Sequence, residues 1–234
     1  MRIVALLPIK AHSARVPGKN FKPLAGIPLF DWILRTLLVL PEITEVVINT
    51  DARPHLAEAG LVESPRVRLR DRKPALCGDL VSMNLILADD IAHNPADLYL
   101  MTHATNPILR AATIRAAIAA YAAARLTGKA DSLFTVNRHQ ARFYHEDGSP
   151  VNHDPQNLLR TQDLPPFLEE NSNLYLFTAA SFSATHARVG QKPLLFETPR
   201  LESWDIDDPD GWRLAEIFAA DTLHRGEPPW KLPA

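Results

Sequence analysis

Short apolar runs alternate with longer segments of helical periodicity along most of this chain. We predict strands at 3–7, 45–50, 67–69, 97–101, 131–136, 173–178 and 194–197. We predict helices at 29–40, 55–59, 81–91 and 112–124, and from 209 or 210 to about 223. Because strands that alternate with helices favour parallel pairing, the pattern predicts an α/β fold with a mostly parallel sheet flanked by helices.

Length and composition narrow the class of protein. A chain of 234 residues with 46% apolar content suits one domain with a sizeable core. The net charge of −2 argues against general binding to nucleic acid or membranes, so a basic cluster should serve a local anionic ligand. Without a transmembrane run or a leader pattern, we expect a cytoplasmic protein. The single cysteine, Cys77, excludes an internal disulfide and fits either a buried position or a loop.

The loop after the first predicted strand concentrates cationic and small polar residues. Within ten residues it holds Lys10, Ser13, Arg15, Gly18 and Lys19. A loop at the carboxyl end of a parallel strand lies where α/β sheets bind ligands, and such residues suit a triphosphate. The loop matches neither the Walker pattern nor the dinucleotide-binding glycine pattern. Phosphate binding and a solvated basic loop both fit these residues.

Polar residues also follow later predicted strands. Asp51 directly follows one strand, and the stretch 102–110, which includes His103, follows another. These are again positions where α/β sheets bind ligands. The charge run 70–74 lies ahead of Asp79, and it fits a solvated turn or a substrate-side role equally well.

The alternating pattern loosens at about 138–170. Glycine and proline in this stretch indicate a hairpin or an excursion from the sheet. His139, His145 and His153 lie there at irregular spacing, so we interpret them as surface or interface residues rather than metal ligands. We therefore expect residues 1–234 to form a single domain with one excursion.

Two aspartates near the end of the chain, Asp205 and Asp207, flank Ile206. In extended geometry both carboxylates point to one side. The two charges repel unless a cation lies between them or one group is protonated, and a hard ion such as Mg²⁺ suits them. The alternative is acidity at a helix start, which explains Asp208 as an N-cap but does not require Asp205.

Together, the opening loop and the aspartate pair suggest nucleotidyl transfer. The cations would hold a triphosphate, and the carboxylates would place Mg²⁺ at the reacting phosphate. Phosphoryl chemistry of this kind depends on positioning and charge, with little covalent work by the protein. The periodicity of the sequence identifies neither the nucleobase nor the acceptor of the reaction.

Several motifs resemble those of the acylneuraminate cytidylyltransferases. LPIKAHSARVPGKN at 7–20 is similar to the family signature I-P-A-R-x-G-S-K-R-L-P-G-K-N. Further similarities are TD at 50–51, TNP at 105–107, RTQDLP at 160–165, ENSNLY at 170–175, and DID at 205–207, which matches the D-x-D metal motif. They follow the family's order and cover nearly the whole chain.

The resemblance implies a Rossmann-like α/β domain, a homodimer built by the excursion, and transfer of CMP from CTP to an acidic sugar with release of pyrophosphate. On the CTP side it implies contacts from Lys10, Ser13, Arg15 and Lys19, to which we add Asp79. Mg²⁺ would bind Asp205 and Asp207, and the catalytic residues would be Arg15, Lys19 and Asp207. The acceptor, whose anomeric hydroxyl attacks the α-phosphate, would lie against His103, Gln162, Asn171 and Tyr175.

The chain departs from the family pattern on both sides of the predicted site. Lys10 stands where the family has arginine and lacks its bidentate fork. Other replacements are His12 for glycine, Ala14 for lysine, His103 for glutamine, and Ser172 and Asn173 for Gly-Ala at the acceptor wall. We expect these replacements to alter binding of the acceptor more than binding of CTP.

Our leading hypothesis is a Mg²⁺-dependent cytidylyltransferase that acts on a nonulosonic acid or a sugar of the Kdo type. An alternative is the same CMP transfer onto another small anion, such as a phosphonate or phosphonoformate. A third reading, from a different class, is a non-catalytic nucleotide-binding scaffold. The cation lost at Ala14 favours this scaffold, whereas the intact Asp205 and Asp207 argue against it.

Overall fold

The computed structural model describes residues 1–232 of the chain. The strands are β1 (Ile3–Leu6), β2 (Pro23–Leu24), β3 (Ile27–Pro28), β4 (Ile43–Thr50), β5 (Val67–Asp71), β6 (Leu98–Thr102), β7 (Ser132–His139), β8 (Phe167–Phe177) and β9 (Pro193–Glu197). The α-helices are α1 (Leu29–Leu38), α2 (Arg53–Glu58), α3 (Met83–His93), α4 (Ala111–Leu126), α5 (Ala179–Thr185) and α6 (Pro209–His224). Three 3₁₀ turns within the described residues are η1 (Pro74–Leu76), η2 (Thr161–Asp163) and η3 (Arg200–Ser203).

Seven strands form the main sheet in the order β5-β4-β1-β6-β8-β7-β9, and β2 pairs with β3 in a small ribbon. The pairs β1–β4, β1–β6, β4–β5 and β7–β9 are parallel. β8 runs antiparallel to both β6 and β7, because after β7 the chain passes through residues 140–166 and returns alongside β7 as β8. The predicted mostly parallel α/β sheet is confirmed, with β8 as its exception.

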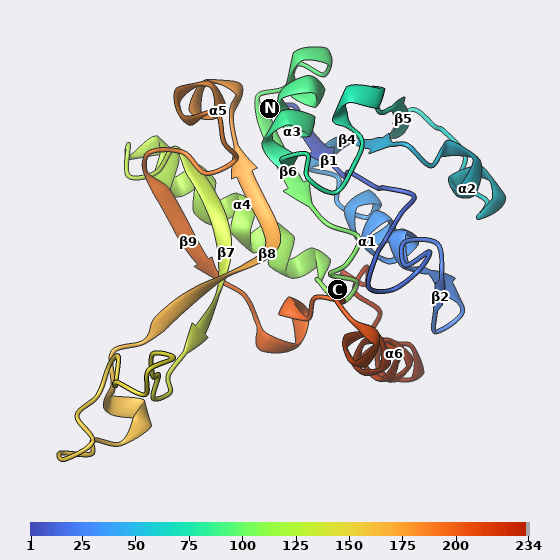
Figure 1. Ribbon diagram of the computed structural model, residues 1–234. Helices are drawn as coiled ribbons and strands as arrows, with labels where there is room; N and C mark the ends of the chain where they lie inside the picture. The colour runs from blue at the N-terminus through green and yellow to red at the C-terminus, as the bar shows by residue number, and fades with distance from the viewer. Residues whose placement is uncertain (233–234) are drawn as a thin grey trace.

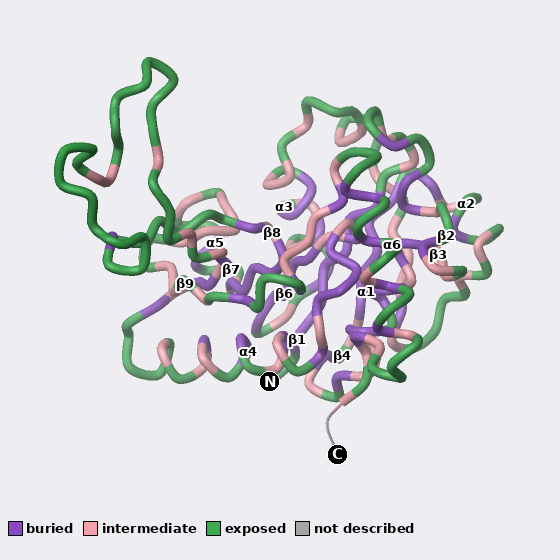
Figure 2. The backbone as a smooth tube through the Cα atoms, turned by 90° about the horizontal axis from the view of Figure 1, so that it is seen from below, coloured by how far each residue is buried: buried purple, intermediate pink, exposed green. Residues whose placement is uncertain are grey.

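Helices cover both faces of this sheet (Figure 1). Because side chains alternate along a strand, Ile3 and Ala5 of β1 join the core under α1 and α4, whereas Val4 and Leu6 join the core under α3 and α5. A third cluster packs α6 against α1 and the opening loop, and it includes Ile206. Figure 2 shows the central strands buried between these layers.

The β2–β3 ribbon, β8 and α5 differ most from the sequence prediction, which contains no strand at 23–28. β8 begins at Phe167 rather than at 173, because its first residues are exposed and are held by the ladder with β7 instead of by burial. Helix α5 was not predicted. The side chain of Thr178 accepts from the Ser181 N–H, and the Ser181 hydroxyl accepts from the Thr178 N–H, a capping box that starts this short helix.

Residues 140–166 project from the ends of β7 and β8, away from the rest of the molecule (Figures 1 and 2). This segment lies within the predicted excursion at about 138–170, and most of it is exposed. Its use in dimerisation stays a prediction. No helix in residues 1–232 is both long and apolar enough to cross a membrane.

Candidate active site

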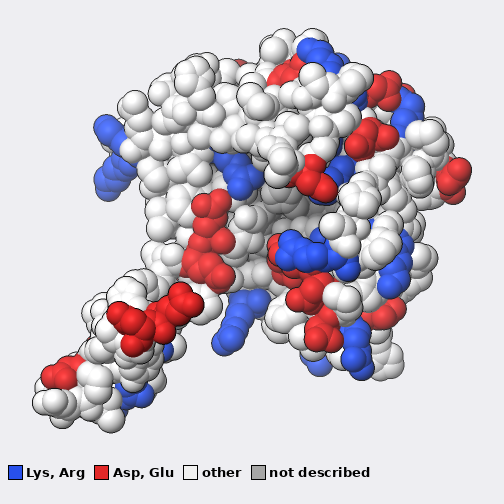
Figure 3. Space-filling view, viewed as in Figure 1, with Lys and Arg blue, Asp and Glu red and all other residues white. Residues whose placement is uncertain are grey.

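A cavity of about 470 Å³ lies at the carboxyl ends of β1 and β6, the edge where α/β sheets bind ligands. The predicted site residues that border it are Lys10, Ser13, Arg15, Lys19, Asp79, His103 and Asp207. In Figure 3 the surface is hollowed near the middle of the view, with basic and acidic groups around the hollow. The structure thus brings the predicted nucleotide side together with one predicted acceptor residue.

The opening loop is fixed to the sheet at both of its ends. Past β1 the chain stays extended, and the Ile9 N–H donates to the Asn49 carbonyl at 2.9 Å. The Asn20 side-chain N–H donates to the Lys10 carbonyl at 2.9 Å, which closes the loop on itself. Asp51, singled out for its place after a strand, accepts the Ala11 N–H at 2.7 Å. These bonds hold the loop cations at the cavity before any ligand binds.

The loop contacts the aspartate segment directly. Arg15 lies 2.9 Å from Asp207, nitrogen to carboxylate oxygen, and the Lys19 ammonium lies 3.9 Å from the same oxygen. Lys19 also donates to the Ile206 carbonyl. Burial lowers the pKa of Lys19, while the Asp205 and Asp207 carboxylates oppose that shift. The predicted catalytic residues Arg15, Lys19 and Asp207 therefore form one contiguous group.

The aspartate pair has the properties of a cation site. Asp205 and Asp207 both border a hollow of about 300 Å³, while Ile206 between them is buried in the core. Asp205 Oδ1 is buried and accepts no hydrogen bond. Burial raises the pKa of Asp205, and the Asp207 charge raises it further, although a Thr105 hydrogen bond opposes the shift. A buried carboxylate oxygen without a partner is a ligand available to a hard cation, so these residues fit Mg²⁺.

The two carboxylates would not complete a metal shell by themselves. Within residues 1–232, no group of three or more His, Cys, Asp or Glu side chains is arranged to hold a metal ion. Mg²⁺ commonly binds through one or two carboxylates together with substrate phosphates and water. The geometry therefore suits an ion that arrives with a phosphate ligand.

On the opposite wall of the cavity, Lys10 pairs with Asp79 at 2.7 Å. The hydrogen bond and charge of Lys10 lower the pKa of Asp79. Asp79 lies in the turn between η1 and α3, so this pair joins two loops across the cavity mouth.

The predicted acceptor residues do not all lie together. His103 borders the cavity, where burial lowers its pKa to about 3. Tyr175 is buried behind it in β8 and donates to Glu170 and, at 3.1 Å, to Ser172. Gln162 belongs to η2 in the projecting segment. The acceptor roles of Gln162 and Tyr175 stay predictions.

Asn171, in β8, links side chains of three separate segments of the chain. Its side-chain N–H groups donate to Asn137 at 3.0 Å and to Thr198 at 2.7 Å. A further contact reaches Ser203 at 3.3 Å, in the segment that leads to the aspartate pair. Its predicted acceptor role stays untested, whereas its structural role is visible in these bonds.

Sequence reasoning left the charge run 70–74 undecided, and the structure divides it. Arg70 pairs with Asp89 at 2.6 Å, and Lys73 also contacts Asp89. Arg72 borders the cavity and donates instead to neutral oxygens of Asn49, at 2.9 Å to the side chain and 2.8 Å to the carbonyl. Arg72 is thus a rigidly held cation in the wall, which the sequence did not distinguish from its neighbours.

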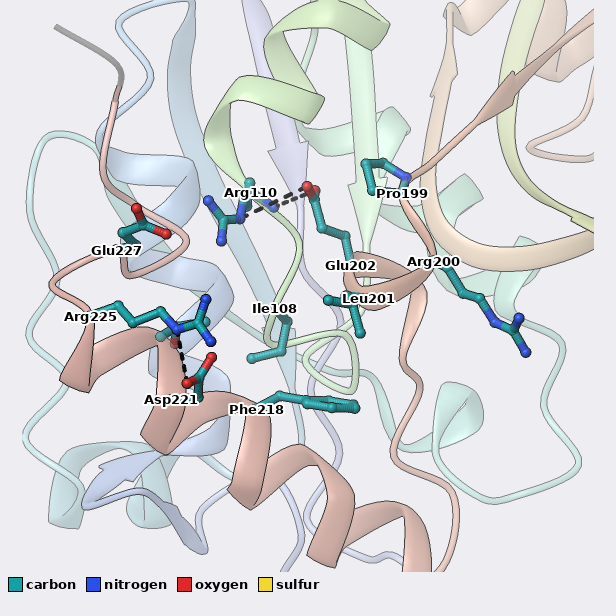
Figure 4. A pocket seen from close by; sticks show the side chains of 11 residues that line it. Ile108, Arg110, Pro199, Arg200, Leu201, Glu202, Phe218, Asp221, Arg225 and Glu227 are labelled. Carbon is teal, nitrogen blue, oxygen red and sulfur yellow. Dashed lines mark hydrogen bonds and ion pairs between the residues drawn. The ribbon is translucent and has the colours of Figure 1, made fainter.

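A second cavity of about 380 Å³ lies between η3 and α6 (Figure 4). Two of its guanidinium groups have partners within the wall: Arg225 pairs with Asp221 at 2.9 Å, and Arg110 Nε lies 4.0 Å from a Glu202 carboxylate oxygen. Seven of the predicted site residues border the first cavity, and none of them borders this one. We therefore assign the candidate active site to the first cavity.

The sequence profile described as cytidylyltransferase matches residues 4–198. The chain belongs to the cytidylyltransferase family. The predicted family relationship is confirmed. The match ends before the aspartate pair at 205–207, so the description of this pair rests on the structure alone.

Similar cytidylyltransferases share about a quarter to a third of their residues with this chain. The N-acylneuraminate cytidylyltransferase of Oncorhynchus mykiss is 29% identical over 222 residues, which cover 92% of this chain and 49% of that protein. The N-acylneuraminate cytidylyltransferase B of Danio rerio is 29% identical, with 91% and 50% covered. The CMP-N,N'-diacetyllegionaminic acid synthase of Legionella pneumophila is 27% identical, with 92% and 95% covered. The chain thus spans about half the length of the two former relatives.

Solved structures confirm the predicted Rossmann-like fold. A CMP:2-keto-3-deoxy-manno-octonic acid synthetase complexed with CTP superposes with a TM-score of 0.67 at 14% identity, covering 95% of this chain and all of that one. A 4-diphosphocytidyl-2C-methyl-D-erythritol synthase from Anaerococcus prevotii gives 0.66 at 12% identity, covering 93% and 95%. At these identities the likeness concerns the fold alone.

Proposed function

We propose that this protein transfers CMP from CTP to an acidic sugar, of the nonulosonic acid or Kdo type, and releases pyrophosphate. The observation that carries the proposal is the meeting of Arg15 and Lys19 with Asp207 at one cavity. Cations for a triphosphate and a carboxylate for a metal ion are the two parts that phosphoryl transfer requires. The names of the sialic and legionaminic relatives support an acidic sugar as the acceptor.

In this proposal the loop residues bind the nucleotide. Lys10, Arg15 and Lys19 neutralise the triphosphate, and Ser13 adds a hydrogen bond. The anomeric hydroxyl oxygen of the acceptor forms a bond to the α-phosphorus while the bond to the pyrophosphate oxygen breaks. The hydroxyl proton passes to solvent water, and pyrophosphate leaves with the electrons of the broken bond.

We propose Mg²⁺ as the cofactor, bound by Asp205 and Asp207. When bound, the ion supplies positive charge at the reacting phosphate. The unpartnered Asp205 oxygen supports this assignment, because an ionised carboxylate in such a place gains from a cation. Arg15 and Lys19 hold the segment that carries both carboxylates, so they orient the metal ligands as well as the nucleotide.

On the acceptor side we propose His103, Gln162, Asn171 and Tyr175 as the contact residues. His103 is the main support for this part of the proposal, because it borders the same cavity as the residues proposed to bind CTP. With a pKa of about 3 it is neutral at neutral pH, so it serves the acceptor as a hydrogen-bonding group rather than as a charge.

We also propose a homodimer in the cytoplasm that acts on small molecules. The projecting segment exposes apolar side chains, among them Leu158 and Leu159, and this favours a role in contact with a second copy. Cys77 is a free thiol, which is common for proteins of a reducing compartment.

The test is pyrophosphate release with CTP and Mg²⁺ across N-acetylneuraminate, Kdo and small phosphonates. We expect release with a sugar acid. Release with a phosphonate alone would transfer the proposal to the alternative acceptor class. CTP binding without release for every acceptor would contradict the enzymatic proposal and favour a nucleotide-binding scaffold.

A further inference from the structure

Arg188 is a cation next to the predicted acceptor residues that the sequence analysis did not single out. It lies in the loop between α5 and β9, and its guanidinium carbon is 3.9 Å from the centre of the Tyr175 ring. Its backbone N–H donates to the Asn84 side chain at 3.3 Å, which fastens the loop to α3. The side chain is 20% exposed, so part of it reaches solvent while its contacts with Tyr175 and Glu170 hold the guanidinium.

The position of Arg188 relative to His103 gives the site two cationic sides. One guanidinium nitrogen lies 3.9 Å from the sulfur of Met101, two residues before His103. The charges of Arg188 and Lys19 both depress the pKa of His103, after the larger effect of burial. His103 therefore shares the cavity with Lys19 and is also within range of the Arg188 charge.

The guanidinium keeps donors free for a ligand. Arg188 donates to Glu170 at 3.4 Å, longer than the usual range for a charged pair, and this carboxylate is itself 44% exposed. The same Glu170 oxygen accepts the Tyr175 hydroxyl. An arginine has five N–H donors in a planar fork that matches a carboxylate, so the long bond to Glu170 and the weak contact with the Met101 sulfur leave most of that fork unused.

We propose that Arg188 binds the carboxylate of the acceptor sugar and so makes this enzyme select an acidic acceptor. This inference rests on the proposed function. The carboxylate docks against the guanidinium, next to His103, and the sugar then lies between Arg188 and the nucleotide side of the cavity. The cation–π contact with Tyr175 and the bond to Glu170 position the fork for this contact.

The experiment compares Arg188→Gln and Arg188→Lys with the parent enzyme. KM is measured for CTP and for the acceptor, using N-acetylneuraminic acid and its carboxamide. We expect Arg188→Gln to raise KM for the acid by about tenfold or more, and to leave KM for CTP within about twofold. Its preference for the acid over the carboxamide should disappear, and Arg188→Lys should restore part of it.

Arg115→Gln is the matched control. This substitution also removes a guanidinium from an ion pair, because Arg115 lies 2.6 Å from Glu42. Arg115 is on α4, away from the cavity. An unchanged preference for the acid in Arg188→Gln would overturn the inference. An equal loss on acid and carboxamide would also overturn it, since that is the result of a merely structural role.

Binding measurements separate this inference from the proposed function. Calorimetry of the same acid and carboxamide is performed with CTP present for the parent and for Arg188→Gln. If the parent binds the acid in preference to the carboxamide but turns over no acceptor, the proposed function fails, and loss of the preference in the variant still supports Arg188. If the parent binds neither compound, both proposals are overturned.

Discussion

Lys19 donates a hydrogen bond to the carbonyl oxygen of Ile206, the residue between Asp205 and Asp207. This bond joins the first loop of the chain to a segment 187 positions later. The Lys19 side chain is 11% exposed, so the contact is largely removed from solvent. The cationic loop and the aspartate pair are therefore arranged toward each other by the fold itself, which reduces the reorganisation needed when a charged substrate binds.

Substitution of Asp207 by alanine should abolish transfer and leave the fold intact. Its carboxylate is 50% exposed and contacts Arg15 rather than apolar core. A metal-bound charge is worth several kcal/mol at the transition state, so we expect turnover with CTP and Mg²⁺ to fall by about a hundredfold or more. Asp221→Ala, at a 49% exposed position of α6 that is paired with Arg225, is the control and should keep full activity. Undiminished activity of Asp207→Ala at saturating Mg²⁺ would contradict the metal assignment.

Substitution of Arg15 by alanine should weaken CTP binding. The variant loses a charged donor that faces the cavity, and such a contact is worth about 1.5–3 kcal/mol, or about tenfold or more in affinity. Calorimetric titration with CTP measures the effect directly. Arg213→Ala removes an equal charge at an 82% exposed site on α6 and should bind CTP as the parent does. Equal affinity of both variants would refute the role of Arg15.

Substitution of Asp205 by asparagine should stabilise the metal-free protein at neutral pH. The folded-state pKa of Asp205 is raised above its ordinary value of 3.8, so ionisation of this group costs stability when the pH lies above the folded pKa. Asparagine keeps the shape and removes the charge. The gain in Tm, about 2–4 °C for each kcal/mol, should therefore be present at pH 7.

The pH dependence provides the check on Asp205. As the pH falls through the folded pKa toward 3.8, the parent also loses this charge, and the difference in Tm between parent and variant should shrink. Thermal unfolding from pH 8 to pH 4, in the presence of a chelator, measures it. A difference that grows toward acid, or no difference at pH 7, would show that the Asp205 charge is not a source of instability.

The nucleotide side of the site could be predicted from the sequence because its residues are neighbours along the chain. Lys10, Ser13, Arg15 and Lys19 lie in one loop, and the strand before it has a clear apolar pattern. Asp207 lies 192 positions from Arg15, and no local pattern pairs them. In the prediction the chemistry of nucleotidyl transfer supplied that link and the family motif supported it, and in the structure the packing of Ile206 into the core supplies it.

Other residues gained their importance only from tertiary contacts. Arg72 lies in a run whose other cations form ion pairs, and its place in the wall depends on oxygens of Asn49. Arg188 lies alone in a loop after α5, a helix that the sequence analysis does not predict. Side chains of this kind carry no periodic signal, so the sequence gives no means to choose among arginines.

Replacement of Leu158 and Leu159 by lysine should turn the proposed dimer into a monomer. The two side chains are 63% and 52% exposed in the projecting segment, and burying them against a second copy would stabilise association, whereas two lysines there would oppose it. Light scattering coupled to gel filtration gives the mass of each species. Leu126→Lys, at an 88% exposed position at the end of α4, introduces lysine for leucine outside this segment and should leave the dimer unchanged. A double variant that keeps the parent's dimeric mass would exclude these leucines from the interface.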